Sequence, residues 1–269
     1  MRYCRFVSNG RTHYGRVEDR NGEPWIVGPA PAPEEDLAFR LQNAGAAAPD
    51  FPPLPLSAAN LLPPVTPSKI ICVGRNYREH AQELGNAIPA EPMLFFKPPS
   101  ALLAPDGTVL LPRICERVDY EGELVLVIGQ RVRNLKASGN WRAVIRGCTI
   151  ANDISSRDLQ KKDGQWARAK GFDTFCPIGP IVSNELDFDA GIMLETRLNG
   201  EVRQHASTSD LIFPIPVLLE ANSRAFTLEP GDIILTGTPS GVGPLKSGDR
   251  VEVSVERLGT LRNRVEAES

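Results

Sequence analysis

The pattern of apolar and polar residues divides the chain into many short strands and few helices. Runs of β-branched and apolar residues suited to a pleated sheet occur at 69–74, 93–97, 123–129, 147–153, 192–202, 232–237 and 250–256. Patterns typical of helices occur at 78–85, 137–147, 155–162 and 215–226. Because strands and helices do not alternate regularly, the sequence predicts a β-rich α+β fold rather than a doubly wound one.

The first quarter of the chain differs from the rest. Residues 3–22 read as short strands separated by Asn-Gly turns, which is typical of hairpins. Seven prolines then fall between Pro49 and Pro67, a density that blocks helix interiors and central strands. We therefore predict a small N-terminal β-rich domain with a proline-rich connector at 1–66, and a main domain at 67–269.

Two strands that mix valine with glutamate show contrasting patterns. In VDYEGELVLVIG, at 118–129, Glu121 and Glu123 share a face with Val125 and Val127, while the opposite face is apolar as well. This strand should enter a covered interior. In RVEVSVE, at 250–256, the valines occupy one face and the polar residues the other, so those glutamates should face solvent.

Composition narrows the compartment and the partners. The chain has 269 residues, 41% of them hydrophobic, and a net charge of -3, so nothing favours nucleic acid or an anionic membrane as a partner. Five scattered cysteines without a C-x-x-C pair argue against a disulfide framework. With no secretory leader and no apolar run of membrane-spanning length, the expected location is the cytoplasm.

The inward-facing carboxylates are the first candidate chemistry. A buried lone carboxylate must be neutralised, paired or bound to a cation, and two on one face also repel each other. Asp153, at the end of the run 147–153, supplies a third oxygen ligand without a nearby histidine. Such a set favours Mg²⁺, Mn²⁺ or Ca²⁺ over zinc. The alternative is that both glutamates lie at a strand end and pair with arginines such as Arg117.

His80 and Glu83 lie three residues apart on the helix predicted at 78–85, and are therefore neighbours on its surface. A carboxylate beside an imidazole fixes the tautomer and keeps the ring basic enough to take a proton from water. The alternative is an ordinary exposed helical pair, since such short patterns are common.

Two further segments carry polar chemistry. The glycine-rich stretch after the strand at 232–237 lacks the Gly-Lys-Ser/Thr of a phosphate-binding loop, but its N–H groups could hold a carboxylate or an enolate. It could equally be a tight turn. Lys170 lies among apolar residues and glycines and could pair with a substrate anion. The alternative is a surface lysine.

Taken together and in this order, these motifs closely resemble the fumarylacetoacetate hydrolase family. The matching segments span roughly residues 69–255, and they are GRNYREHAQELG, EPMLFFKPPSALLAP, VDYEGELVLVIG, ANDISSRDLQKKDGQWARAKGFDTFCPIGP and GDIILTGTPSGVGPLKSGD. The region before residue 69 matches the bacterial single-chain members, which include acylpyruvases and 2-hydroxyhepta-2,4-diene-1,7-dioate isomerases, only loosely.

The resemblance implies a mixed β-sandwich roll, homodimeric in most members, with a Mg²⁺ or Mn²⁺ ion held by Glu121, Glu123 and Asp153. It assigns a catalytic dyad to His80 and Glu83, on a segment that often acts as a mobile lid. It also assigns the family's substrate-binding lysine to Lys170 and pocket-lining positions to Arg157, Gln160 and Thr238. Lys97 fits the pattern, but its role varies among members.

The function expected from this resemblance is metal-dependent hydrolysis of a C–C bond in a small 2,4-dioxo acid such as an acylpyruvate or fumarylpyruvate. The substrate head would chelate the ion, His80 would activate water, and a metal-stabilised pyruvate enolate would leave. Rival reactions at the same site are decarboxylation of oxaloacetate and isomerisation or decarboxylation of a 2-hydroxydienoate, because a fold does not choose between chemistries. A protein that only binds small acids would not need the dyad.

Overall fold

The computed structural model describes residues 1–44, 51–83, 85 and 87–269, and it is rich in β-structure, as predicted. The largest sheet runs, in spatial order, through β4 (Leu54–Pro55), β3 (Glu23–Pro29), β2 (Arg11–Arg20), β1 (Arg2–Ser8), β14 (Cys176–Ser183), β12 (Ile145–Asn152), β11 (Gly122–Ile128), β17 (Ile233–Leu235), β6 (Ile70–Gly74) and β7 (Met93–Lys97). Two more strands join it at the side, β5 (Asn60–Leu62) on β1 and β8 (Leu102–Leu103) on β14.

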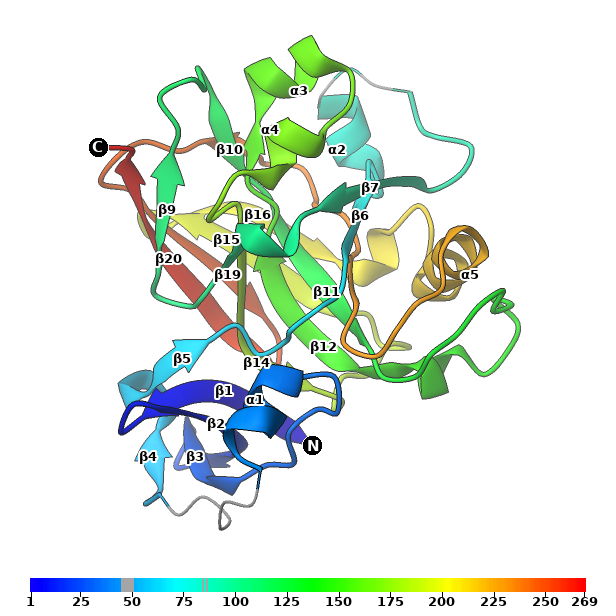
Figure 1. The fold of residues 1–269 in the computed structure, drawn as a ribbon. Coiled ribbons are helices and arrows are strands. Elements are labelled where there is room, and N and C mark those ends of the chain that lie inside the picture. The colour runs from blue at the N-terminus through cyan, green and yellow to red at the C-terminus, as the bar shows by residue number, and fades with distance from the viewer. Residues whose placement is uncertain (45–50, 84, 86) are drawn as a thin grey trace.

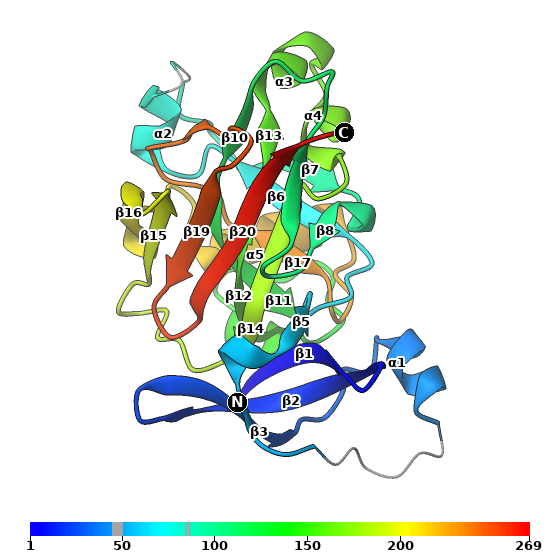
Figure 2. The same ribbon diagram turned by 90° about the vertical axis from the view of Figure 1, so that its left-hand side faces the viewer.

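A second sheet packs against the first and has the order β16 (Glu201–Ser207), β15 (Met193–Leu198), β19 (Arg250–Val255), β20 (Gly259–Ala267) and β9 (Thr108–Leu111). Three short strands form a third sheet, in the order β13 (Ser155–Ser156), β10 (Val118–Tyr120) and β18 (Gly243–Pro244). Figure 2 shows β19 and β20 of the second sheet in front of β11, β12 and β14 of the first.

Helices are few and short. They are α1 (Leu37–Gln42), α2 (Arg78–Glu83), α3 (Arg157–Asp163), α4 (Ala167–Gly171) and α5 (Ile215–Ala225), with single 3-10 turns at Leu56–Ala58, Pro99–Ala101, Trp141–Val144 and Thr208–Asp210. Helices α2, α3 and α4 gather at the end of the molecule opposite the N-terminal strands (Figure 1). No helix within the described residues is both long enough and apolar enough to cross a membrane.

Strand β11 lies at the centre of the core. Every residue of it is buried, as its two apolar faces predicted. Leu124, Leu126 and Ile128 pack toward β15, β19 and α5, whereas Val125 and Val127 pack on the other face with β6 and β17. Burying such side chains contributes roughly 1.5–3 kcal/mol each, so this strand is a rigid support for whatever residues precede it.

The strands of residues 1–66 form the hairpins that the Asn-Gly turns predicted. Residues Asn9 and Asn21 adopt positive φ angles of 50° and 53° at the two turns. Strand β1 also pairs with β14, so the N-terminal hairpins extend the large sheet. The division at residue 67 stays a prediction, and the part of the proline-rich connector at residues 48–50 lies outside the described residues.

One predicted helix is wrong. Residues 137–147 form only a 3-10 turn at Trp141–Val144, and Ile145 already begins β12. The β-branched residues Val144 and Ile145 favour extended structure, and Ile145 pairs with Ile128 of β11. Sheet pairing therefore overrides a local helical pattern. The helix predicted at 78–85 is observed as α2 and ends at Glu83, while Leu84 lies outside the described residues.

Candidate active site

Glu121 and Glu123 are directed into the molecule by the glycine between them. Gly122 faces the second sheet, where an added Cβ would lie 2.2 Å from Thr196 Oγ1. The residues on either side of Gly122 must then point to the opposite side of the strand. Both carboxylates are buried, at 4% and 2% exposure. Because only glycine fits against the second sheet at position 122, both neighbouring glutamates must point to the opposite face.

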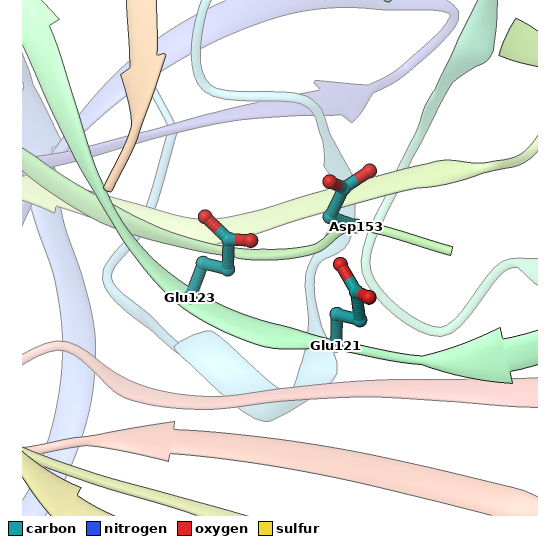
Figure 3. Close-up of side chains that lie close together, drawn as sticks. All are labelled: Glu121, Glu123 and Asp153. Atoms are coloured by element: carbon teal, nitrogen blue, oxygen red, sulfur yellow. The ribbon is translucent and has the colours of Figure 1, made fainter. Parts of the chain in front are cut away.

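Asp153 joins them through the antiparallel pairing of β11 with β12. Gly122 lies opposite Asn152, and the Asp153 amide donates to the carbonyl of Glu121 at 2.7 Å. One oxygen from each of the three carboxylates lies within 4.8 Å of the others. Figure 3 shows the three side chains converging from two neighbouring strands. The structure therefore brings together the three residues predicted as metal ligands.

Buried cations contact two of the three carboxylates. Lys170 Nζ donates to Glu121 at 2.8 Å and to Asp153 at 2.7 Å, and Lys97 Nζ donates to Asp153 at 2.6 Å. Arg157 donates to Glu121 at 2.5 Å. Lys170 is 2% exposed, so the surface-lysine alternative is wrong. Arg117 pairs with Asp119 rather than with either glutamate, so Arg157 is the arginine that contacts Glu121.

Glu123 has no cationic partner in the part of the chain that the structure describes. Among the described residues its one hydrogen-bond donor is the backbone N–H of Gly237, at 2.6 Å. Burial, together with the negative charges of Asp153 and Glu121, raises the pKa of Glu123 well above its ordinary value. Burial alone would also raise the pKa of Glu121, but the charges of Arg157 and Lys170 outweigh it and lower that pKa. Of the three acids, Glu123 is the one that no cationic side chain of the described residues contacts directly.

This arrangement fits a divalent cation. Carboxylate oxygens are the ligands that Mg²⁺ and Mn²⁺ prefer, and three of them converge without sulfur or imidazole among them. A divalent cation here would place a positive charge beside Glu123 and would weaken the repulsion among the three carboxylates.

His80 and Glu83 occupy α2 as predicted, and they differ in burial, because the Glu83 side chain is 32% exposed while the His80 ring is buried. His80 is 4% exposed, and its Nδ1 lies 3.3 Å from Glu83 Oε2. The Glu83 carboxylate also accepts the N–H of Gly241, at 3.1 and 3.3 Å from its two oxygens. The tautomer with hydrogen on Nδ1 satisfies Glu83 and leaves the other ring nitrogen free to take a proton.

His80 and the three carboxylates line one cavity of about 480 Å³. The residues that line it are Val73, Gly74, Arg75, His80, Phe95, Glu121, Glu123, Asp153, Arg157, Gln160, Lys161, Trp166, Lys170 and Thr238. All nine of the predicted site residues except Glu83 are in this set, and Glu83 contacts it through His80. The rings of Phe95 and Trp166 pack edge to face, with their centroids 5.1 Å apart, and give the cavity an apolar wall.

The three predicted substrate-binding residues also hold the site together. Arg157 donates to Asp119, Glu121 and Gln160. The Thr238 hydroxyl donates to the Gly122 carbonyl at 2.9 Å and accepts from Gln204 at 2.8 Å. They therefore line the cavity while fixing the strand that carries the glutamates.

The glycine-rich loop holds carboxylates, as its exposed N–H groups suggested, but they are the protein's own. Gly237 donates to Glu123 and Gly241 donates to Glu83. Sequence reasoning missed this double role, and it also missed Asp119, which is fully buried between Arg117 and Arg157. The signal for Asp119 was present, since it continues the alternation of acids in VDYEGE by two residues.

Comparison with known proteins agrees with these observations. Residues 69–266 match the family described as Fumarylacetoacetate (FAA) hydrolase C-terminal. Oxaloacetate tautomerase YisK of Bacillus subtilis is 43% identical over 224 residues, which cover 78% of this chain and 74% of that protein.

Two solved structures are also similar. The 5-carboxymethyl-2-hydroxymuconate delta-isomerase of Mycobacterium smegmatis is 40% identical, with a TM-score of 0.85 and full coverage of both chains. The fumarylpyruvate hydrolase of Pseudomonas aeruginosa, in complex with Mn²⁺ and pyruvate, is 31% identical with a TM-score of 0.70, covering 76% of this chain and 91% of that one.

Proposed function

The chain belongs to the fumarylacetoacetate hydrolase family, and we propose that it is a divalent-metal-dependent enzyme acting on small 2-oxo or 2,4-dioxo acids. The observation that carries this proposal is one cavity lined by three converging carboxylates and by His80, whose ring is paired with Glu83. The named relatives act on substrates of related chemistry, and one of them is described with Mn²⁺ and pyruvate.

Glu121, Glu123 and Asp153 would hold Mg²⁺ or Mn²⁺, because Glu123 is the buried acid without a cationic partner among the described residues. When bound, such an ion supplies Lewis-acid chemistry that draws electrons from a 2-oxo group. Lys170 already donates to Glu121 and Asp153, and its ammonium carries a third N–H that can bind a substrate oxygen. Arg157, Gln160 and Thr238 would shape the rest of the pocket.

The first proposed reaction is hydrolysis of an acylpyruvate. His80, oriented by Glu83, takes a proton from water, and the resulting hydroxide attacks the distal carbonyl carbon. The bond between that carbon and C3 breaks, its electron pair passes to the pyruvate half as an enolate, and C3 then takes up a proton. The products are a carboxylic acid and pyruvate. The buried His80, paired with Glu83 beside the triad, favours this reaction, because hydrolysis requires a base that can activate water.

The second candidate is keto–enol tautomerisation of oxaloacetate, in which a proton moves between C3 and the 2-oxo oxygen and no water is consumed. His80 could carry this proton. The observation favouring it is the identity of 43% to the oxaloacetate tautomerase of Bacillus subtilis. Decarboxylation of oxaloacetate, or isomerisation of a 2-hydroxydienoate, would use the same electron flow toward the 2-oxo group.

A direct rate comparison tests these proposals. Purified protein with Mg²⁺ or Mn²⁺ is given acetylpyruvate, keto-oxaloacetate or enol-oxaloacetate, each with and without chelator. Chelator-sensitive formation of acetate and pyruvate from acetylpyruvate would support hydrolysis. Accelerated loss of the enol absorbance without pyruvate would assign the tautomerase, and pyruvate from oxaloacetate alone would assign a decarboxylase. Turnover that persists undiminished in chelator would refute the metal-dependent proposal.

We also propose that the protein is a homodimer, the assembly that the family resemblance implies. Sedimentation velocity of the purified chain at several concentrations tests this, and a single species at the monomer mass would contradict it.

A further inference from the structure

The helix that carries the dyad is attached to the protein differently at its two ends. Asn76, just before α2, is fully buried and exchanges hydrogen bonds with Phe213, while its side chain also donates to the carbonyl of Thr236 at 2.8 Å. At the other end, the described contacts of Glu83 outside the helix are with the backbone N–H of Gly241. Ser240 of the same loop also donates to Glu79 of α2, at 3.1 Å. A six-residue helix is not stable alone, so the loop that contains Gly241 helps to determine where the dyad end of α2 lies.

Gly241 is held in place from two directions. Its φ is +96°, and an added Cβ would lie 1.9 Å from the carbonyl oxygen of Arg203, so the loop is packed directly on β16. The hydroxyl of Tyr120 donates to the Gly241 carbonyl at 2.9 Å. The N–H and the C=O of this one residue therefore connect Glu83 on α2 with Tyr120 on β10.

Tyr120 is next to the first of the candidate metal ligands. It is 2% exposed, its ring packs in a core cluster with Val118 and Phe175, and its chain neighbour is Glu121. A continuous set of hydrogen bonds thus runs from β10 through Tyr120, Gly241 and Glu83 to His80. The segment that leads into Glu121 and the helix that carries His80 are therefore connected through the same residues.

We propose that Tyr120 is a positioning residue for the His80–Glu83 dyad. Its hydroxyl fixes Gly241, and Gly241 in turn fixes the carboxylate that orients the imidazole. The inference rests on the proposed function of the dyad as a base, and it adds a residue that contacts neither substrate nor His80. A base placed even slightly wrongly loses much of its effect, so removing this support should slow turnover without weakening substrate binding.

Tyr120→Phe keeps the ring in the core and removes the donor. We expect kcat to fall about tenfold, the lower end of losses when a supporting residue is removed, with KM within about twofold. Mn²⁺ affinity should be unchanged in calorimetry. Tyr14→Phe is the matched control, because Tyr14 is a buried tyrosine that donates to Asp36 at 2.8 Å in the N-terminal strands, and its kcat should equal the wild-type value.

A double-mutant cycle with Glu83→Ala tests the route. If Tyr120 acts through Glu83, adding Tyr120→Phe to the Glu83→Ala variant should lower kcat by less than about a further twofold, since the two residues act as a unit. An equal tenfold loss in both backgrounds, or a Tyr120→Phe enzyme with wild-type kcat, would overturn the proposal.

Hydrogen exchange gives a readout that does not depend on turnover. The amides of α2 should exchange faster in Tyr120→Phe than in wild type, while those of β12 should not change and Tyr14→Phe should leave α2 unaffected. Unchanged exchange in α2 would overturn the proposal even if kcat fell. If the wild-type protein turned over neither acetylpyruvate nor oxaloacetate, the proposed function would fail, and the exchange of α2 would still decide whether Tyr120 holds the helix.

Discussion

Glu123 on β11 and Glu252 on β19 are both glutamates that alternate with valines, yet their surroundings differ. Glu252 lies on the outer face of the second sheet and pairs with Arg262 at 2.7 Å and Arg250 at 3.5 Å. Glu123 is buried, and its hydrogen bond among the described residues comes from one backbone N–H. Glu252 is half-buried and is neutralised by Arg250 of its own strand and Arg262 of the neighbouring strand β20, whereas no cationic side chain of the described residues contacts Glu123.

Two histidines, one in the cavity and one on the second sheet, each lie beside a glutamate at a similar distance. His80 Nδ1 lies 3.3 Å from Glu83, and His205 Nδ1 lies 3.4 Å from Glu195 of β15. The side chain of His80 is 5% exposed and that of His205 is 60% exposed. The two imidazole–carboxylate distances are thus nearly the same, although the two histidines differ greatly in burial. A contact between two residue types does not make a site, because solvent weakens the electrostatic influence of the carboxylate on the ring.

The largest effect should come from removing the charge of the buried acid. Glu123→Gln should abolish Mn²⁺ binding and reduce turnover to the level seen in chelator, a loss of more than the roughly 100-fold typical of residues that only support a ligand. Electron paramagnetic resonance of Mn²⁺ measures the binding. Glu252→Gln is the matched control and should bind Mn²⁺ as wild type does. Wild-type affinity in Glu123→Gln would remove the distinction between the two glutamates.

The second largest effect should come from the histidines, because substituting His80 and His205 should change kcat to very different extents. His80→Gln should lower kcat by about 10²–10⁴-fold, the usual contribution of a general base, and should leave Mn²⁺ binding intact. His205→Gln should leave kcat unchanged, because that ring lies on the exposed hairpin of β15 and β16. Steady-state kinetics on the substrate identified above makes the comparison. If His80→Gln retained the full hydrolytic rate, the dyad would have no role in activating water.

The stability of the metal-free protein should depend on pH in a direction set by Glu123. Its pKa in the folded chain is raised above the ordinary value of 4.5, so its favourable contribution is complete below pH 4.5 and is lost as the pH rises through the raised pKa. Glu123→Gln should remove this loss and stabilise the metal-free protein at pH 8 by about 1–3 kcal/mol, the cost of an unsatisfied buried group.

Urea unfolding in chelator at pH 5 and pH 8 measures this difference. With Mn²⁺ present the ranking should reverse, because the ion binds the ionised carboxylate and stabilises only the wild-type protein. A metal-free wild type that gained stability relative to Glu123→Gln between pH 5 and pH 8 would contradict the assignment of Glu123 as the acid that no cationic side chain of the described residues contacts.

The smallest effect should come from an ion pair on the outer face of the second sheet. Arg262→Ala removes a cation that contacts Glu252, and it should cost less than about 1 kcal/mol of unfolding free energy, as is usual for ion pairs near the surface. The same urea measurement, repeated in 0.5 M salt, should shrink the difference further. A cost as large as that of losing a buried partner would mean that Glu252 is not compensated by solvent and by Arg250.

The sequence alone was sufficient for the fold class and for most of the candidate site. Alternation distinguishes the covered strand at 123–129 from the half-exposed one at 250–255, because side chains on a strand alternate between two faces. The E-x-E spacing, Asp153, His80 and Glu83 can all be identified from the sequence as candidates. The helix predicted at 137–147 failed because its residues find a strand partner in β11, and local patterns do not report such long-range pairing.

Only the tertiary structure decided which charges meet. Lys97, Arg157 and Lys170 approach the carboxylates from β7, α3 and α4, so no spacing along the chain could reveal that Glu123 is the acid left without a cationic partner among the described residues. The sequence determines which residues face inward, because that follows from the local periodicity of a strand. The identity of their partners depends on how distant segments pack, and from that packing follow the pKa values, the support of Tyr120 and the proposed chemistry.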